Sequence, residues 1–144
     1  MRALALVAAL AALLSGCAAS APEPVASDLE GTWVHGGTTL VLASDGTFTL
    51  SNAPRYTLFT DTEGWRDGDT STRDGFGDWS LEPDAVRLDN VQGEKFHGEK
   101  LFLGLPDRLY FGLDMGSTNP RCFELVREGS EAEPRDPEDC WLSP

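Results

Sequence analysis

The sequence predicts an all-β domain, an antiparallel up-and-down barrel of about eight strands. Three observations predict this fold class. Apolar and polar residues alternate in short runs from Leu29 to Arg127, turn residues separate the runs, and no amphipathic helical stripe appears in this region. The chain has 144 residues and is 40% hydrophobic, which suits one packed core. A β-sandwich or a half-open barrel is the alternative architecture for the same pattern.

Eight runs are predicted to be strands, and short turn sequences join several of them. Ser44-Asp45-Gly46, Pro83-Asp84 and Leu105-Pro106-Asp107 are typical of the tight turns between neighbouring strands. Strands joined so tightly must be antiparallel neighbours. The predicted strands are Leu29–His35, Thr38–Ala43, Thr47–Ser51, Gly77–Glu82, Ala85–Asn90, Lys100–Gly104, Arg108–Leu113 and Arg121–Arg127.

The phase of the alternation predicts one dry face and one wet face, a pattern that a sheet closed on itself satisfies without exposed edges. The wet face carries residues such as Thr32, Thr39, Thr49, Arg87 and Glu124, with Val34, Val41, Phe102 and Val126 as apolar exceptions. An eight-stranded barrel is only just wide enough for its own side chains, so the inward set predicts a filled interior. The predicted inward residues are Leu29, Trp33, Leu40, Leu42, Phe48, Leu50, Trp79, Leu81, Val86, Leu88, Leu101, Leu103, Leu109, Phe111, Leu113, Phe123 and Leu125.

The first sixteen residues predict export. Met1-Arg2 is a short positive start, and Ala3 to Leu14 is an apolar run too short, at about 18 Å as a helix, to cross a bilayer core of about 30 Å. Leu14-Ser15-Gly16-Cys17 resembles the lipobox of bacterial lipoproteins. The resemblance implies cleavage after residue 16 and a diacylglyceryl group on the Cys17 thiol. An ordinary secretory signal with a chance cysteine is the alternative.

Residues 17–28 are predicted to be a lipidated N-terminus and a flexible tether. Ala18 to Ser27 are small, Pro-containing and without apolar periodicity. Ten such residues reach roughly 17–19 Å, which would keep the domain close to the membrane. The predicted location is therefore the extracytoplasmic side of the cell membrane, with the lipid on Cys17 as the membrane contact.

The remaining two cysteines predict a disulfide. With Cys17 lipidated, Cys122 and Cys140 form an even pair in an exported protein, where disulfides persist. Residues 128–144 form an acidic tail whose prolines oppose regular structure. Because Cys122 lies on the wet face by parity, a Cys122–Cys140 disulfide would fold this tail over the outside of the barrel.

Two Gly-x-Trp motifs carry a resemblance to a known group of barrels. Gly31-Thr32-Trp33 opens the first predicted strand, and Gly77-Asp78-Trp79 occurs later. A Gly-x-Trp on the first strand of such a meander resembles the lipocalin and avidin group of calycin-type barrels, which implies that Trp33 packs across a closed end. The second motif departs from lipocalins and suggests an internal pseudo-repeat. The pattern LEGTWVHGGTTLVLASDGTFTL, then GDWSL, LYFGLD and CFELVR, is similar to small lipoproteins of high-GC Gram-positive bacteria of unassigned role.

Few residues point to chemistry. The chain has no Gly-x-Ser-x-Gly, P-loop, His-Glu-x-x-His or Cys-x-x-Cys motif, and its two histidines, His35 and His97, are interpreted as surface or turn residues. Residues 52–76 form a long connection, and Arg55–Thr60 within it is a candidate short strand. Its acidic residues suggest a weak Ca²⁺ site, but their spacing does not match the twelve-residue calcium loop, so a solvated loop is the preferred interpretation. These residues are Asp61, Glu63, Asp67, Asp69 and Asp74.

The charge and the motifs together favour a non-catalytic role. A formal net charge of -13 opposes binding to nucleic acid. No catalytic residue, metal or cofactor is expected. The preferred hypothesis is an anchored binding or interaction module of the cell envelope, with an envelope protein as partner. A lipocalin-like carrier of a small apolar ligand is the second hypothesis, and an envelope enzyme is the third and weakest.

Overall fold

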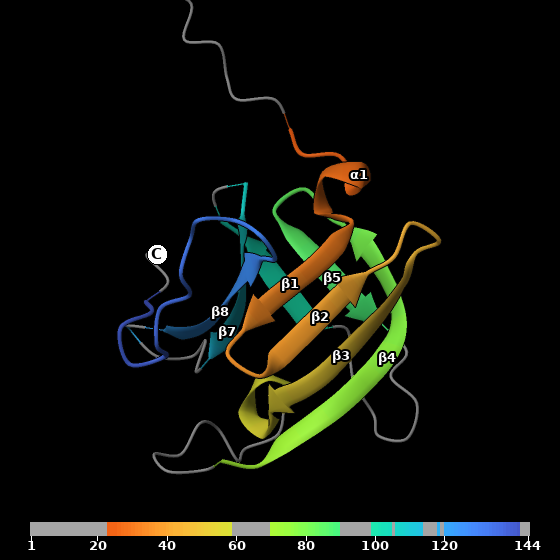
Figure 1. The fold of residues 1–144 in the computed structure, drawn as a ribbon. Coiled ribbons are helices and arrows are strands. Elements are labelled where there is room, and N and C mark those ends of the chain that lie inside the picture. Colours follow the sequence, from red (N-terminus) through yellow and green to blue (C-terminus); the bar gives the residue numbers. More distant parts are fainter. Residues whose placement is uncertain are drawn as a thin grey trace, which may run out of the picture.

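A computed structural model describes residues 23–58, 70–89, 99–104, 106–113, 118 and 120–141. Eight antiparallel strands form a closed barrel in which each strand pairs with its neighbour in the chain and the last pairs with the first (Figure 1). The predicted all-β barrel is confirmed, and it is compatible with a lipocalin-like barrel. Its strands are β1 (Gly31–His35), β2 (Thr38–Leu42), β3 (Thr47–Pro54), β4 (Thr72–Leu81), β5 (Ala85–Asp89), β6 (Glu99–Leu103), β7 (Arg108–Leu113) and β8 (Arg121–Arg127).

Two strands are longer than the sequence predicts because a β-bulge lets them continue. The register of β3 with β4 shifts between Leu50 and Ala53. Asn52 has a positive φ of 52°, and its backbone N–H donates to Asp74 Oδ1 at 2.8 Å. Asn tolerates this conformation better than most residues. The bulge carries the pairing past Ser51, where the alternation of apolar residues ends.

The short strand predicted at Arg55–Thr60 is wrong for its first four residues. Arg55–Leu58 form the 3₁₀ turn η1 instead. The Thr57 hydroxyl donates to the Pro54 carbonyl at 2.8 Å, a contact three residues back along the chain that favours a tight turn over extended backbone. The rest of this prediction, from residue 59 to residue 60, lies outside the described residues.

The interior of the barrel is filled by the residues that the alternation points inward. All seventeen predicted residues belong to one hydrophobic cluster, with Leu81 and Leu103 only partly buried and Ala53 as an addition. Trp33, Leu40, Leu101, Leu109 and Leu125 are fully buried. The side chains of these strands therefore pack against one another across the barrel.

One end of the barrel is closed by Trp33 and the short helix α1 (Ala26–Leu29). The Trp33 indole N–H donates to the Leu29 carbonyl at 2.9 Å. The Arg127 guanidinium lies 4.5 Å from the Trp33 ring and donates to the Glu30 carbonyl at 2.9 Å. Gly31 has a φ of 126°, and a Cβ there would lie 3.2 Å from Arg127. The Gly in the first Gly-x-Trp thus makes room for the arginine that covers the tryptophan.

The second Gly-x-Trp fastens the hairpin between β2 and β3 at the same end. The Trp79 indole N–H donates to the Ala43 carbonyl at 2.8 Å, and its backbone N–H donates to the Gly46 carbonyl at 2.7 Å. Gly46 has a φ of 83°, as the predicted Ser44-Asp45-Gly46 turn requires. Both tryptophans therefore belong to the core, as predicted. They also anchor the backbone that closes the barrel.

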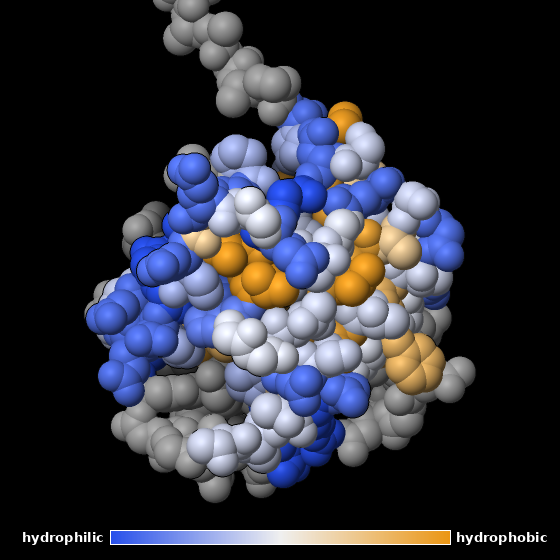
Figure 2. Space-filling view, viewed as in Figure 1, coloured by the Kyte–Doolittle hydropathy of each residue, from blue (hydrophilic) through white to orange (hydrophobic). Residues whose placement is uncertain are grey.

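The outer surface is not uniform. Figure 2 faces the wall formed by β1, β2 and β3 and shows pale and apolar residues in its centre, with hydrophilic residues around them. The adjoining pair of strands, β7 and β8, is crossed by the C-terminal part of the chain (Figure 1). The two walls thus differ in polarity and in what covers them.

Trp33→Ala is expected to lower the free energy of unfolding by about 3–5 kcal/mol, because it deletes a large buried aromatic and leaves a cavity. Chemical denaturation measures this loss. Phe76→Ala is the control, since Phe76 is 48% exposed and its removal should change stability by about 0.5 kcal/mol or less. Equal losses in the two variants would contradict the packing of Trp33 at the closed end.

Candidate functional site

The best-defined side-chain cluster lies outside the barrel, under a segment that we name the strap, residues 128–141. The predicted disulfide is present: Cys122 on β8 is bonded to Cys140, with their Cα atoms 5.1 Å apart. Cys122 faces outward, as parity predicts, and the strap covers it. Cys122, Glu124 and Val126 are consequently buried even though they lie on the outer face of β8.

The strap also completes the seam between the first and last strands. The ladder of β1 with β8 comprises Trp33↔Arg127 and Val34↔Val126. Below it, the Cys122 N–H donates to the Cys140 carbonyl at 3.0 Å, and Arg121 forms an antiparallel bridge with Trp141. The end of the strap thus takes the place of a strand along the part of β8 that β1 does not reach.

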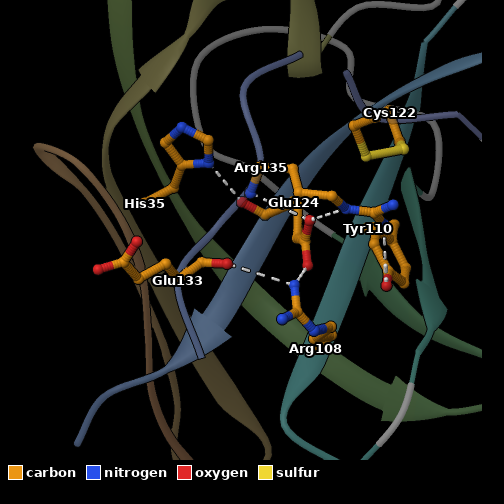
Figure 3. The surroundings of a disulfide bond; sticks show 8 residues. His35, Arg108, Tyr110, Cys122, Glu124, Glu133 and Arg135 are labelled. Atoms are coloured by element: carbon orange, nitrogen blue, oxygen red, sulfur yellow. Dashed lines mark hydrogen bonds and ion pairs between the residues drawn. A yellow bond between two sulfur atoms is a disulfide. The ribbon is translucent and has the colours of Figure 1, made fainter. Parts of the chain in front are cut away.

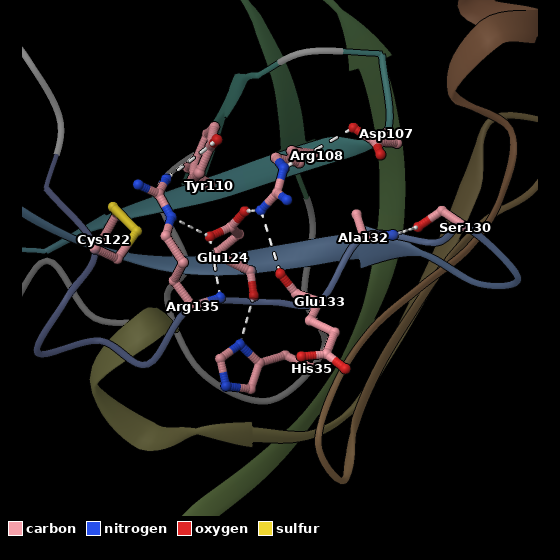
Figure 4. Close-up of polar contacts among 11 residues, drawn as sticks. His35, Asp107, Arg108, Tyr110, Cys122, Glu124, Ser130, Ala132, Glu133 and Arg135 are labelled. Atoms are coloured by element: carbon pink, nitrogen blue, oxygen red, sulfur yellow. Dashed lines mark hydrogen bonds and ion pairs between the residues drawn. A yellow bond between two sulfur atoms is a disulfide. The ribbon is translucent and has the colours of Figure 1, made fainter.

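Glu124 is the electrostatic centre of this wall (Figures 3 and 4). Its side chain has 0% exposure. Oε2 accepts hydrogen bonds from Arg135 Nε at 2.8 Å and from the Arg135 backbone N–H at 3.2 Å, while Oε1 pairs with Arg108. A buried carboxylate is costly unless charged partners surround it. Glu124 therefore binds the strap to β7 and β8 through one arginine from each side.

The two arginines are themselves held in place. Arg108 Nη1 donates to the Glu133 carbonyl of the strap at 3.4 Å. The Arg135 guanidinium lies 5.9 Å from the Tyr110 ring, and its Nη2 donates to the Tyr110 hydroxyl at 3.4 Å (Figure 4). Because arginines occupy both oxygens of Glu124, this carboxylate is not available to a substrate. The cluster therefore fastens the strap to the barrel.

His35 fills the gap between β1 and the strap. It ends a strand, as predicted, but it is half-buried rather than a surface residue, because its ring stacks on Phe123 with centroids 4.4 Å apart. Its Nδ1 lies 2.6 Å from the Glu124 carbonyl, which can only accept, so Nδ1 carries the proton. Burial lowers the pKa of His35 below 6.5, and the carboxylate of Asp136 opposes this shift.

The other predicted site residues are placed as follows. Cys17, His97, Asp61, Glu63, Asp67 and Asp69 lie outside the described residues. Asp74 is exposed and serves the β3 bulge. Among the residues that the structure describes, no group of three or more His, Cys, Asp or Glu side chains is arranged to hold a metal ion. In the same part of the chain, no helix is long and apolar enough to span a membrane.

No family model, curated protein or solved structure significantly matches this chain. The fold and the strap cluster therefore define the molecule on their own evidence: a closed β-barrel with a packed interior and a disulfide-fastened outer segment.

Cys140→Ser should lower the free energy of unfolding by about 3 kcal/mol, because the disulfide closes a loop with a sequence separation of 18. The strap should also become more sensitive to proteases, since only the non-covalent contacts of Arg135 with Glu124 and of Arg108 with the Glu133 carbonyl would then hold its middle. Thermal denaturation and limited proteolysis measure the two effects. Glu138→Gln, in the exposed turn next to Cys140, is the control and should behave as wild type. If the strap stayed resistant to proteases in Cys140→Ser, the contacts made by Arg108 and Arg135 would be sufficient to hold it on the barrel.

The lowered pKa of His35 predicts a pH-dependent stability with a definite sign. The unfolded chain takes up a proton near pH 6.5, whereas the folded chain does so at lower pH, so the unfolded state binds more protons in between. The contribution of neutral His35 is full above about pH 6.5 and falls as the pH drops through that window. His35→Gln should make the free energy of unfolding less dependent on pH in this window. If the free energies of unfolding of wild type and His35→Gln changed in parallel between about pH 7.5 and 5.5, the assignment of this pH dependence to His35 would be contradicted.

Proposed function

We propose that this protein is a membrane-anchored extracytoplasmic lipoprotein whose barrel is a non-catalytic binding or interaction module of the cell envelope. The anchor is the lipid on Cys17, which the sequence Leu14-Ser15-Gly16-Cys17 supports. The oxidising compartment that this location implies is the one in which a disulfide such as Cys122–Cys140 persists.

The single observation that carries the binding role is the filled interior. A carrier of a small apolar ligand needs a cavity with a few polar groups among apolar walls. Here the inward residues of all eight strands are buried against one another, and the ring of Trp33 lies under Arg127 at the closed end. The surfaces left for recognition are therefore the outer walls of the barrel, which favours an interaction module over a lipocalin-like carrier.

The place of the N-terminus supports an orientation for the anchored protein. The described chain begins at Glu23 and enters the barrel through α1, which Arg127 fastens to the closed end. Cys17 precedes Glu23 by only a few residues, so the lipid would draw the closed end toward the membrane. The outer walls of the barrel would then run roughly parallel to the membrane normal and be accessible to other molecules of the envelope.

The test uses the full chain expressed in a bacterium, with Cys17→Ala as the variant. Wild type should fractionate with membranes and incorporate a labelled fatty acid, whereas Cys17→Ala should remain uncut or be released, since two acyl chains are what hold a lipoprotein stably. Ala18→Ser, next to the modified residue, is the control and should be anchored. An unlabelled, soluble wild type would overturn the anchor.

The same purified proteins test the interior. Fluorescent apolar probes such as a fatty-acid analogue should show no saturable binding, and the emission of the buried Trp33 and Trp79 should not change when they are added. The result that would favour the carrier over the interaction module is saturable binding of one probe per chain. Such binding should quench Trp33 or Trp79 and raise the stability in proportion to probe concentration.

A further inference from the structure

The disulfide that fastens the strap is shielded from solvent on the outer wall of β7 and β8. Cys122 and Cys140 are both 0% exposed. The residue that pairs with Cys122 on β7 is Gly112, which has no side chain to occupy the space beside the disulfide. A thiolate reduces a disulfide only by direct attack on one of its sulfurs. While the strap is in place, a thiol in solution therefore cannot reach either sulfur.

The strap is held beside this disulfide by Arg135. In both close-up views the Arg135 side chain lies next to the disulfide, between it and Glu124 (Figures 3 and 4). Its Nε and its backbone N–H donate to Glu124 Oε2 at 2.8 and 3.2 Å, and its Nη2 donates to the Tyr110 hydroxyl at 3.4 Å. Arg135 precedes Cys140 by five residues, so this contact fixes the part of the strap that leads into the disulfide.

The strap has a second contact beyond the disulfide, and that contact is more exposed. The Cys122 N–H donates to the Cys140 carbonyl at 3.0 Å, and Trp141 forms a backbone bridge with Arg121. Trp141 is 47% exposed and is the last described residue of the strap. Exposed chain ends with few buried contacts open at low free energy. The contact that keeps the sulfurs covered is therefore the buried one, through Arg135.

Releasing Arg135 is costly because of the burial of Glu124. The Glu124 side chain is 0% exposed, and its charge is shared between Arg135 and Arg108. When Arg135 leaves, Arg108 alone compensates a carboxylate that is still largely removed from water. Breaking a buried ion pair in this way is strongly unfavourable. The strap should therefore spend only a small fraction of the time in an open state.

We propose that Arg135 controls the access of thiols to the Cys122–Cys140 disulfide, so that reduction occurs only after Arg135 has left Glu124. The strap is then released in a fixed order, in which the ion pair breaks first and the disulfide second. The wall of β7 and β8 is uncovered only when both are broken. This inference goes beyond the proposed function and does not depend on the lipid anchor.

The redox step is thiol–disulfide exchange with a dithiol as the reductant. One thiolate of the dithiol attacks a sulfur of the disulfide, the S–S bond breaks, and its electron pair leaves on the other cysteine as a thiolate. The second thiol of the reductant then attacks the mixed disulfide and releases the remaining cysteine. The dithiol is oxidised to a disulfide, and the two protons that it loses end on the two cysteines.

Reduction of the folded full chain by dithiothreitol tests this control. Alkylation followed by mass spectrometry of the peptides measures the free thiols of Cys122 and Cys140 separately from Cys17. The wild-type disulfide should be reduced at least about a hundredfold more slowly than in the chain unfolded in urea, where the sulfurs are accessible. Arg135→Gln should be reduced about tenfold or more faster than wild type, because Glu124 no longer holds the strap. Arg135→Lys, which keeps the charge, should have an intermediate rate.

Two control variants separate this effect from a general loss of contacts. Arg87→Gln removes an arginine from the exposed ion pair with Asp89 on another wall, and Trp141→Ala removes the exposed aromatic beyond the disulfide. Both should be reduced within about twofold of the wild-type rate, as expected for substitutions at the surface. Urea below the unfolding transition should leave the wild-type rate nearly constant, because a local opening exposes little surface.

Three results would overturn the control by Arg135. The first is a folded wild type that is reduced as fast as the unfolded chain. The second is an equal rate for Arg135→Gln and Arg87→Gln, or a larger effect of Trp141→Ala than of Arg135→Gln. The third is a rate that rises with urea as steeply as global unfolding does, which would show that the whole barrel must open. If Arg135→Gln does not fold, Arg135→Lys and the urea series decide.

Discussion

The structure depends on closing a sheet whose first strand is shorter than its last. β1 has five residues and β8 has seven, and their ladder comprises two register pairs. An unclosed edge would leave backbone donors and acceptors without partners, so both ends of this seam need other groups. At one end Arg127 clamps Trp33 and α1 together. At the other, the His35 ring and the end of the strap take up the backbone of Glu124 and Cys122.

This constraint explains why the strap carries both a disulfide and a buried ion pair. A disulfide alone restricts where Cys140 can lie, but it does not set the path of the residues between β8 and Cys140. The pairing of Glu124 with Arg135 fixes the middle of that path, and the contact of Arg108 with the Glu133 carbonyl fixes the residues before it. Without the arginines, Glu124 would be a buried charge without a partner, and the pairing therefore specifies one position for the strap.

Much of the fold can be predicted from the sequence because period-two alternation is local and strong. The inward residues, the Ser44-Asp45-Gly46 turn and the outward position of Cys122 all follow from that period and its phase. The Asn52 bulge does not, since it depends on a hydrogen bond to Asp74 on the next strand. Glu124 also reads as a solvated residue in the sequence. Only the strap, which returns from later in the chain, turns that wet position into a buried one.

The proposed anchoring raises the question of how an acidic domain can stand beside a membrane surface that is itself anionic. Repulsion between exposed charges is screened over about 8 Å at physiological ionic strength. Eight residues separate Cys17 from α1, and flexible chains of eight residues in general span roughly 14–17 Å. The closed end would thus lie about two screening lengths from the lipid headgroups. At that distance the repulsion between the acidic domain and the headgroups is largely screened, so it does not oppose attachment through the lipid. The repulsion would grow if the barrel approached or entered the membrane surface. The domain would thus stay close to the membrane without inserting into it, and its outer walls would remain accessible.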